Sequence, residues 1–223
     1  MDVTALAPAR CFAHDLFVEG TTLVQDTTTM AVDLAGFTSL TERLSVWGSH
    51  GTERLSQVLR GYFEGVTDLV VEAGGDVVAF GGDSLSILFD GPPRTTVRAA
   101  LDAAQRVQQL TAATEAVAVP GGSLSLQVRL GVARGAVATA VARSGGRLLP
   151  VHVGPGLDLA HAAQEAAATG SVAVDGSAGP WRSGAAATGP TRVGPRLTGT
   201  RLTGARPSGT RPAVDALLPA ALL

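Results

Sequence analysis

One stretch constrains the fold more than any other, and it runs from Met30 to Glu42. Its first residues, Met-Ala-Val-Asp-Leu, form an apolar segment with a single carboxylate, Asp33, where a buried strand would end. A small-residue turn follows, and Ser39-Leu-Thr-Glu42 has the spacing of a capping box that begins a helix. A carboxylate at a strand tip can hold a hard cation, and free N–H groups at a helix start face an anion. The stretch predicts a metal and phosphate site; the alternative is a surface Asp before an ordinary strand–helix turn.

A second stretch, residues 74–89, carries the matching carboxylate. It consists of two apolar segments joined at Gly81-Gly82-Asp83, which is the pattern of a hairpin with a carboxylate at its turn. Between the two stretches, apolar residues recur at three- and four-residue steps over residues 55–70 and predict a long amphipathic helix. Because this helix returns the chain to the same edge of a sheet, we expect Asp33 and Asp83 to lie together.

The rest of the pattern is a mixture of helices and strands. It predicts a helix around residues 97–107, a strand over 124–132, weaker strands over 136–141 and 148–153, an Ala-rich helix over 157–168 and a short strand over 171–174. Such an order is typical of an α+β fold in which helices pack on one face of a mostly antiparallel sheet.

The two Asp-containing stretches resemble the class III nucleotidyl cyclases, which make cyclic AMP or cyclic GMP. Asp33-Leu-Ala-Gly-Phe-Thr-Ser-Leu is similar to the first metal-binding segment of that family. Gly74-Gly-Asp and Phe80-Gly-Gly-Asp83 are similar to the second segment. The resemblance covers roughly residues 28–176 and implies a ferredoxin-like α+β cyclase homology domain.

The resemblance also implies a reaction, in which the ribose 3′-oxygen of a nucleoside triphosphate attacks the α-phosphate and pyrophosphate leaves. Two Mg²⁺ or Mn²⁺ ions would be held by Asp33 and Asp83, with a further oxygen from the carbonyl of Leu34. The amides of the following turn would face the triphosphate, namely those of Gly36, Phe37 and Thr38.

Four positions depart from what the resemblance implies. They are Ala79 in place of a base-reading Lys or Glu, Val151 in place of a polar base contact, Asp158 in place of a ribose-orienting Asn, and Ala162 in place of a phosphate-stabilising Arg. The chain contains no Lys, and all 17 of its basic residues are Arg, so no shift of the alignment supplies the missing Lys. Because sites of this family form between two cyclase domains, the chain is similar to the metal-bearing half of such a pair.

Three hypotheses follow from this pattern. The first is a metal-bearing partner that forms cyclic nucleotide, with ATP favoured over GTP, together with a complementary cyclase domain in a homo- or heterodimer. The second is a catalytically inactive cyclase-homology domain that binds a nucleotide or a partner and regulates another activity. The third rests on Phe80-Gly-Gly-Asp83-Ser, which resembles the turn of diguanylate cyclases, although the stretch after Asp33 fits that family poorly.

The composition of the chain limits its expected partners and cellular location. The net charge of −2 gives no reason to expect binding to nucleic acid or to an anionic membrane. One Cys, Cys11, excludes an intramolecular disulfide within the sequence, and no apolar segment reaches the length of a membrane span. We therefore expect a cytoplasmic protein.

The composition also divides the chain into four regions. We expect an N-terminal extension over residues 1–27, the cyclase homology domain over 28–176, a flexible tail rich in Gly, Pro, Thr and Arg over 177–212, and an apolar C-terminal segment over 213–223. The tail contains a five-residue repeat, which starts at Arg196, Arg201 and Arg206, and it lacks the apolar periodicity that a packed core requires.

Overall fold

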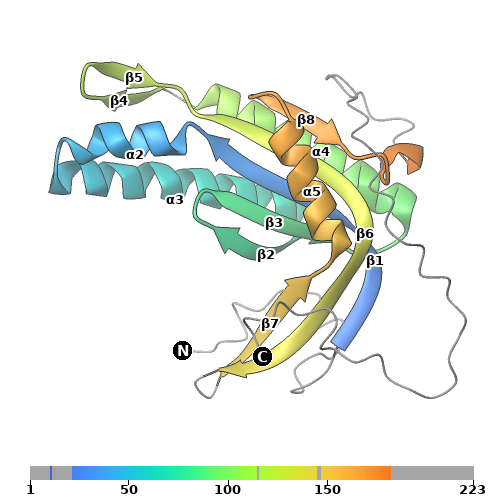
Figure 1. The fold of residues 1–223 in the computed structure, drawn as a ribbon. Helices are drawn as coiled ribbons and strands as arrows, with labels where there is room; N and C mark the ends of the chain where they lie inside the picture. The colour runs from blue at the N-terminus through green and yellow to red at the C-terminus, as the bar shows by residue number, and fades with distance from the viewer. Residues whose placement is uncertain (1–10, 12–21, 115, 145–146, 182–223) are drawn as a thin grey trace, which may run out of the picture.

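The computed structural model of the chain describes residues 11, 22–114, 116–144 and 147–181. Helices and strands are interspersed along the described part (Figure 1). In chain order they are β1 (Thr22–Ala35), α2 (Phe37–Ser45), α3 (Ser49–Glu72), β2 (Asp76–Gly81), β3 (Ser84–Phe89), α4 (Pro93–Ala113), β4 (Val117–Val119), β5 (Gly122–Leu124), β6 (Gln127–Ser144), β7 (Arg147–Val153), α5 (Pro155–Ala166), β8 (Ser171–Val174) and the 3-10 turn η2 (Gly179–Trp181). None of the helices that the structure describes is both long and apolar enough to cross a membrane.

The main sheet has the order β2-β3-β1-β6-β7, and these neighbours pair antiparallel. Its centre is the pairing of β1 with β6, which runs from Thr22 opposite Ala140 to Ala35 opposite Gln127. Strand β8 pairs with β6 in parallel over residues 129–132, beyond the part of β6 that pairs with β7. A separate two-stranded sheet consists of β4 and β5.

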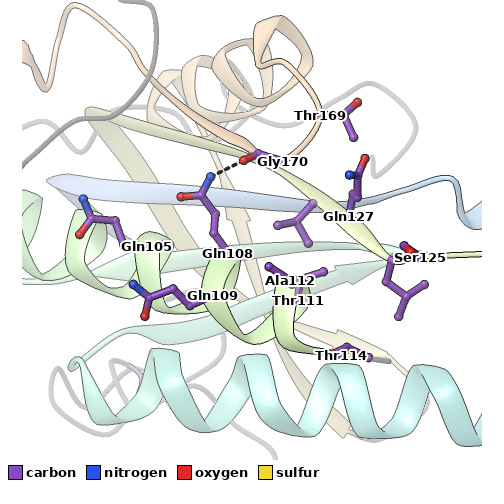
Figure 2. A pocket seen from close by; sticks show the side chains of 12 residues that line it. Gln105, Gln108, Gln109, Thr111, Ala112, Thr114, Ser125, Gln127, Thr169 and Gly170 are labelled. Carbon is purple, nitrogen blue, oxygen red and sulfur yellow. Dashed lines mark hydrogen bonds between the residues drawn. The ribbon is translucent and has the colours of Figure 1, made fainter. Parts of the chain in front are cut away.

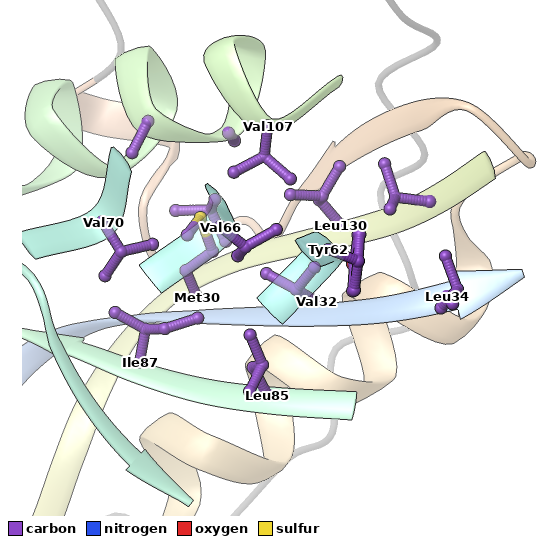
Figure 3. Packing of buried hydrophobic residues seen from close by; sticks show 14 of the residues in the cluster. Met30, Val32, Leu34, Tyr62, Val66, Val70, Leu85, Ile87, Val107 and Leu130 are labelled. Atoms are coloured by element: carbon purple, nitrogen blue, oxygen red, sulfur yellow. The ribbon is translucent and has the colours of Figure 1, made fainter. Parts of the chain in front are cut away.

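The main core lies on the face of the sheet that α2, α3 and α4 cover. Alternate residues of β1, Met30, Val32 and Leu34, are at most 1% exposed and pack in one cluster with Val66 of α3 and Val107 of α4 (Figure 3). This alternation is what a strand with one face on the core requires. The helices expected over residues 55–70 and 97–107 are therefore confirmed, as is the hairpin at Gly81-Gly82-Asp83.

The last helix, α5, packs on the opposite face of the sheet. Ala31 and Ala133, which alternate with the core residues, form a small cluster with Ala160 of α5. At Gly131 an added Cβ would lie 2.1 Å from the carbonyl oxygen of Ala160, so only glycine permits this approach. The α+β fold with a mostly antiparallel sheet is confirmed, while the helices divide between the two faces, with α2 to α4 on one and α5 on the other.

Several boundaries differ from the expected ones. The strand expected over residues 124–132 is interrupted, since β5 ends at Leu124 and β6 begins at Gln127. Strand β6 then continues through residues 136–141 without a break, because β1 pairs with it along its whole length. The β4–β5 pair was not predicted, and the Ala-rich helix runs over residues 155–166 instead of 157–168.

The two ends of the expected domain are also shifted. Strand β1 begins at Thr22, so residues 22–27, expected in an N-terminal extension, pair with β6. At the other end, Ser177 accepts a hydrogen bond from the backbone N–H of Arg134, and Ala178 is fully buried in the core cluster. Both residues had been expected in a flexible tail. The remaining predictions, on residues 182–212 and 213–223 and on most of 1–27, lie outside the described residues.

These contacts predict different outcomes for two deletions. Removing residues 182–212 should leave the melting temperature within about 1 °C of wild type, because the sequence there has no apolar periodicity to bury. Removing residues 176–212 should lower it by roughly 2–10 °C, because the buried Ala178 and the hydrogen bond of Ser177 are lost. Calorimetry and circular dichroism measure both. A loss of cooperative melting in the shorter deletion would contradict the boundary.

Candidate active site

Antiparallel pairing of β1 with β3 brings the two sequence-predicted carboxylates together. Asp33 of β1 lies opposite Ser84, the first residue of β3, so the end of β1 adjoins the β2–β3 turn. The backbone N–H of Leu34 donates a hydrogen bond to the carbonyl oxygen of Asp83 across this junction, at 3.3 Å. Gly82 has a φ of 67°, a left-handed conformation that glycine adopts without strain and that a two-residue hairpin needs. The hairpin chemistry thus places Asp83 next to Asp33.

An arginine that was not predicted completes the charge pattern. Arg129 of β6 lies opposite Asp33 in the sheet, and its Nη2 lies 2.5 Å from Oδ2 of Asp33. The Asp33 side chain is 15% exposed and that of Arg129 is 35% exposed, so the ion pair is partly shielded from water. The buried Nε of Arg129 has no hydrogen-bond partner among the described residues. In the sequence, Arg129 is one polar position of an alternating strand. Its contact with Asp33 depends on the β1–β6 register, which no local pattern specifies.

The charges of the site act on one another. Burial raises the pKa of Asp83 above its usual range, and the negative charge of Asp33 raises it further. A hydrogen bond from the residue's own backbone and the positive charge of Arg129 act in the opposite direction. Burial, followed by the charges of Asp33 and Asp83, also raises the pKa of the Tyr62 hydroxyl well above its usual range. Two carboxylates and a phenol therefore lie within electrostatic reach of one another, an arrangement that a divalent cation would stabilise.

The turn after β1 leaves a free helix N-terminus beside the carboxylates. Gly36 is the N-cap of α2, with a φ of 87°, and it makes no side-chain capping bond. The expected capping box is therefore wrong, since the left-handed Gly36 begins the helix at Phe37 and places Ser39 inside its first turn. The first amides of α2 have no acceptor within the helix, and no acidic residue stands in its first turn. Such an end is suited to an anion, and phosphate binding by the amides of Gly36, Phe37 and Thr38 stays a prediction.

The four departing positions lie on three other elements, β2, β7 and α5. Ala79 is exposed on the edge strand β2, and Val151 is on β7 at the opposite edge of the sheet. Asp158 and Ala162 are both exposed on α5, one turn apart. None of these side chains forms a hydrogen bond or ion pair with Asp33 or Asp83 in the described part of the chain. The structure brings Asp33 and Asp83 together, and it shows no hydrogen bond or ion pair between them and the four departing positions in the described part of the chain.

One polar contact connects α5 with the β2–β3 hairpin. His161 Nε2 lies 2.9 Å from the Oγ of Ser86, and Ser86 pairs with Ala79 across the hairpin. This bond fixes α5 over the strand next to Ala79. It gives a hydrogen-bond partner to the buried hydroxyl of Ser86, which is 8% exposed. The histidine therefore has a structural role in packing α5 on the sheet.

The donor set fits a divalent magnesium or manganese ion when an anionic ligand completes it. Asp33, Asp83 and the carbonyl of Leu34 supply hard oxygen atoms, the type that these ions prefer. Within the described residues no group of three or more His, Cys, Asp or Glu side chains surrounds a common point. A cation at Asp33 and Asp83 would therefore take further oxygen atoms from a bound phosphate, which the N-terminus of α2 is placed to hold.

Comparison with known proteins adds family information. No protein-family model matches the chain. Adenylate cyclase type 10 of Rattus norvegicus is 37% identical over 62 residues, and that of Homo sapiens is 36% identical over 62 residues. The matched segment is 27% of this chain and 4% of each relative, so the chain corresponds to a small part of those proteins.

Solved structures match most of the chain at low sequence identity. The adenylyl cyclase CyaB of P. aeruginosa has a TM-score of 0.60 and 20% identity, with 73% of this chain and 82% of that chain covered. The guanylate cyclase domain of RhGC from Catenaria anguillulae, in complex with GTP, has a TM-score of 0.61 and 17% identity over 74% and 85%. A class III adenylyl cyclase-like ATP-binding protein from Pseudomonas aeruginosa has a TM-score of 0.62 and 18% identity over 72% and 35%.

These matches confirm the resemblance seen in the two Asp-containing stretches. The chain has the fold of a class III nucleotidyl cyclase catalytic domain.

The raised pKa of Asp83 predicts how stability changes with pH. The folded protein binds the proton of Asp83 more tightly than the unfolded chain does, so this group destabilises the fold as pH rises through its raised pKa. Metal-free Asp83→Asn should therefore melt at a higher temperature than wild type at pH 7. The difference should disappear below about pH 4, where an unfolded Asp is also protonated.

Thermal melts in EDTA between pH 3 and pH 8 measure this difference. A lower melting temperature for Asp83→Asn at pH 7 would show that the charged carboxylate makes a net stabilising contact in the metal-free protein.

Proposed function

We propose that the chain binds a complex of Mg²⁺ or Mn²⁺ with a nucleoside triphosphate and forms cyclic nucleotide together with a complementary cyclase domain. The observation that carries this proposal is the β1–β3 junction, where Asp33 and Asp83 adjoin the free N-terminus of α2. Carboxylates beside a helix N-terminus form a site for a metal-bound phosphate. ATP is the favoured substrate, in line with the similarity to adenylate cyclase type 10.

Each element of the junction has a separate task in this proposal. Asp33 and Asp83 hold the cation, which supplies polarisation of the attacking ribose oxygen and neutralisation of phosphate charge when bound. The first amides of α2 hold the triphosphate. The ribose 3′-oxygen then forms a bond to the α-phosphorus and gives its proton to solvent water, while the bond from that phosphorus to pyrophosphate breaks.

Arg129 would exchange partners when the site is filled. Its guanidinium pairs with Asp33, the carboxylate that the cation requires. If Asp33 held a cation, the guanidinium would be free to donate to the triphosphate, including through the Nε that lacks a partner among the described residues. In the unfilled protein the same arginine offsets the repulsion between Asp33 and Asp83.

The second half of the active site must come from elsewhere. Ala79, Val151 and Ala162 offer no side-chain hydrogen bond to a base and no cation to a pentavalent phosphate. We therefore place the missing groups on a complementary cyclase domain, as a heterodimer partner or as another domain of a longer protein. A homodimer would repeat the metal half and lack the cation.

A second candidate function is a nucleotide-binding regulator without catalysis. The observation that favours it is the same loss at Ala79, Val151 and Ala162. It is supported by the similarity to a class III adenylyl cyclase-like ATP-binding protein. This candidate shares the metal and phosphate site with the first one, and differs from it in having no catalytic partner.

Ligand binding should stabilise the fold. With Mn²⁺ and ATP at about ten times the dissociation constant, linkage gives about 1.4 kcal/mol, or a rise in melting temperature of roughly 3–6 °C. Asp33→Asn and Asp83→Asn should each abolish the rise, whereas Asp102→Asn on the exposed face of α4 should keep it. A thermal shift titration with metal alone, nucleotide alone and both together measures it. An unchanged midpoint at millimolar ligand would remove the proposed function.

The purified chain alone should form little or no cyclic nucleotide, even with Mn²⁺. Groups that act mainly in the transition state are missing, so rate falls more than affinity, and loss of a comparable arginine costs about 10³- to 10⁵-fold in rate. Cyclic AMP and cyclic GMP production should be measured for the chain alone and after mixing with a cyclase domain that carries the Lys, Asn and Arg.

The result separates the two candidate functions. Turnover in the mixture that is lost in Asp83→Ala supports the catalytic pair. Nucleotide binding without turnover in either sample supports the regulator. Robust turnover by the chain alone would contradict both and show that other residues have replaced the missing groups.

A further inference from the structure

A groove outside the candidate active site lies between the second half of α4 and the beginning of β6 (Figure 2). Its volume is about 850 Å³, within the size range of ligand pockets in proteins. Glutamine side chains of α4 line one side, and the first residues of β6 with the loop between α5 and β8 line the other (Figure 2). Asp33, Asp83 and Arg129 are not among the described residues that line it, so the groove is separate from the carboxylate pair.

The groove is polar but uncharged. None of the twelve described residues that line it has a charged side chain, so a phosphate, a carboxylate or a metal ion would meet no opposite charge there. None of them is aromatic either, so a nucleobase or a sugar ring would find no surface on which to stack. The ligand that fits is therefore uncharged, and hydrogen bonds have to supply its recognition.

The groove exists because β8 is shorter than the strand beside it. Strand β1 pairs with β6 as far as Gln127, whereas β8 pairs with β6 only from Arg129 onward. Gln127 and Val128 therefore have a strand neighbour on one side only, within the part of the chain that the structure describes. An open edge of this kind is a template for a further extended segment, which pairs with it through main-chain hydrogen bonds.

Gly170, the residue before β8, shows how an extended segment is held at this place. Its backbone N–H donates to the carbonyl oxygen of Val128 at 2.7 Å. Its own carbonyl oxygen accepts a hydrogen bond from Nε2 of Gln108 at 2.6 Å (Figure 2). Strand β6 and an amide side chain of α4 thus bond the same stretch of backbone from two sides, and the chain leaves the groove at this point through the turn that precedes it.

Further groups of the same kinds remain available along the groove. The side chains of Gln109, Ser125, Gln127 and Thr169 are exposed, and none of them forms a hydrogen bond with another described residue. Amide and hydroxyl groups both donate and accept, so they can pair with the N–H and the C=O groups of a peptide.

We propose that this groove binds an uncharged segment of a partner protein as a short additional strand, which continues the line of β8 along the open edge at Gln127 and Val128. Backbone groups of the segment bond to β6 on one side and to the amide side chains of α4 on the other. Main-chain bonds supply the affinity, and the absence of charge in the groove selects against segments with charged side chains. This inference does not depend on the proposed function.

A defined peptide tests the proposal on the full chain. The probe is the acetylated and amidated hexapeptide Gly-Thr-Gln-Thr-Gln-Gly, titrated to millimolar concentration into the ¹⁵N-labelled protein without metal or nucleotide. The amide resonances of Val128 and Gly170 should shift and saturate, because these residues border the open edge. A peptide with Glu in place of both Gln should bind at least about tenfold more weakly, and so should one N-methylated at both Thr, which lacks two backbone donors.

Two neighbouring alanines provide a matched pair of variants. Ala112 is exposed on α4 and lines the groove, whereas Ala113 is exposed and does not line it. Ala112→Arg should fill the groove and abolish the shifts, and Ala113→Arg should bind the peptide as wild type does. Both variants add the same charge at an exposed position of the same helix, so both should melt within about 1 °C of wild type.

The outcomes are distinct. Saturable shifts at the groove that N-methylation weakens and Ala112→Arg abolishes confirm the proposal. An absence of saturable shifts, equal binding by the N-methylated peptide, or equal binding by Ala112→Arg would overturn it. Binding that appears only after removal of residues 182–212 would also overturn it, since the chain's own segment would then be the occupant of the groove.

Discussion

The rest of the structure depends on the hydrogen bonding of β1 to its two neighbours. With β3 it places Asp33 beside the turn that carries Asp83, and with β6 it places Arg129 opposite Asp33. Two carboxylates held this close repel each other, and this repulsion adds to burial in raising the pKa of Asp83. Backbone pairing along 14 positions of β1 and the packing of its apolar face supply the stability that keeps the arrangement in place. The repulsion between the two carboxylates is thus a local unfavourable interaction that the stability of the well-packed sheet outweighs.

The parts of this arrangement that could be predicted from sequence are those that local chemistry dictates. The hairpin at Gly82 requires a left-handed residue, the amphipathic helix follows from its apolar period, and each carboxylate stands at the end of an apolar segment. These features sufficed for the fold class and for the expectation that Asp33 and Asp83 lie together.

The parts that could not be predicted depend on register between distant segments. Arg129 follows Asp33 by 96 positions, and only the pairing of β1 with β6 shows that they meet. The continuity of β6 through residues 136–141 has the same origin, because a strand with weak propensity is extended by the partner beside it. The capping box failed for a different reason. Ser39 and Glu42 have the right spacing, but a glycine in a left-handed conformation begins the helix three residues earlier.

Buried groups without partners, one of them at the carboxylate pair, support the proposal that the site binds a ligand. In the described part of the chain, Tyr62 in the main core and Arg129 beside Asp33 each keep a buried polar hydrogen without an acceptor. A core selected for stability alone would have phenylalanine in place of the tyrosine. It would also have no pair of carboxylates whose repulsion an arginine must offset. A bound metal–triphosphate complex would remove each cost at once, because the cation would neutralise the carboxylates, and its phosphates would give the guanidinium an acceptor. Ala79 and Ala162, by contrast, have no side-chain polar group that a ligand could satisfy. The two sets of family positions therefore differ: Asp33 and Asp83 keep the chemistry that the proposed binding requires, and Ala79 and Ala162 do not.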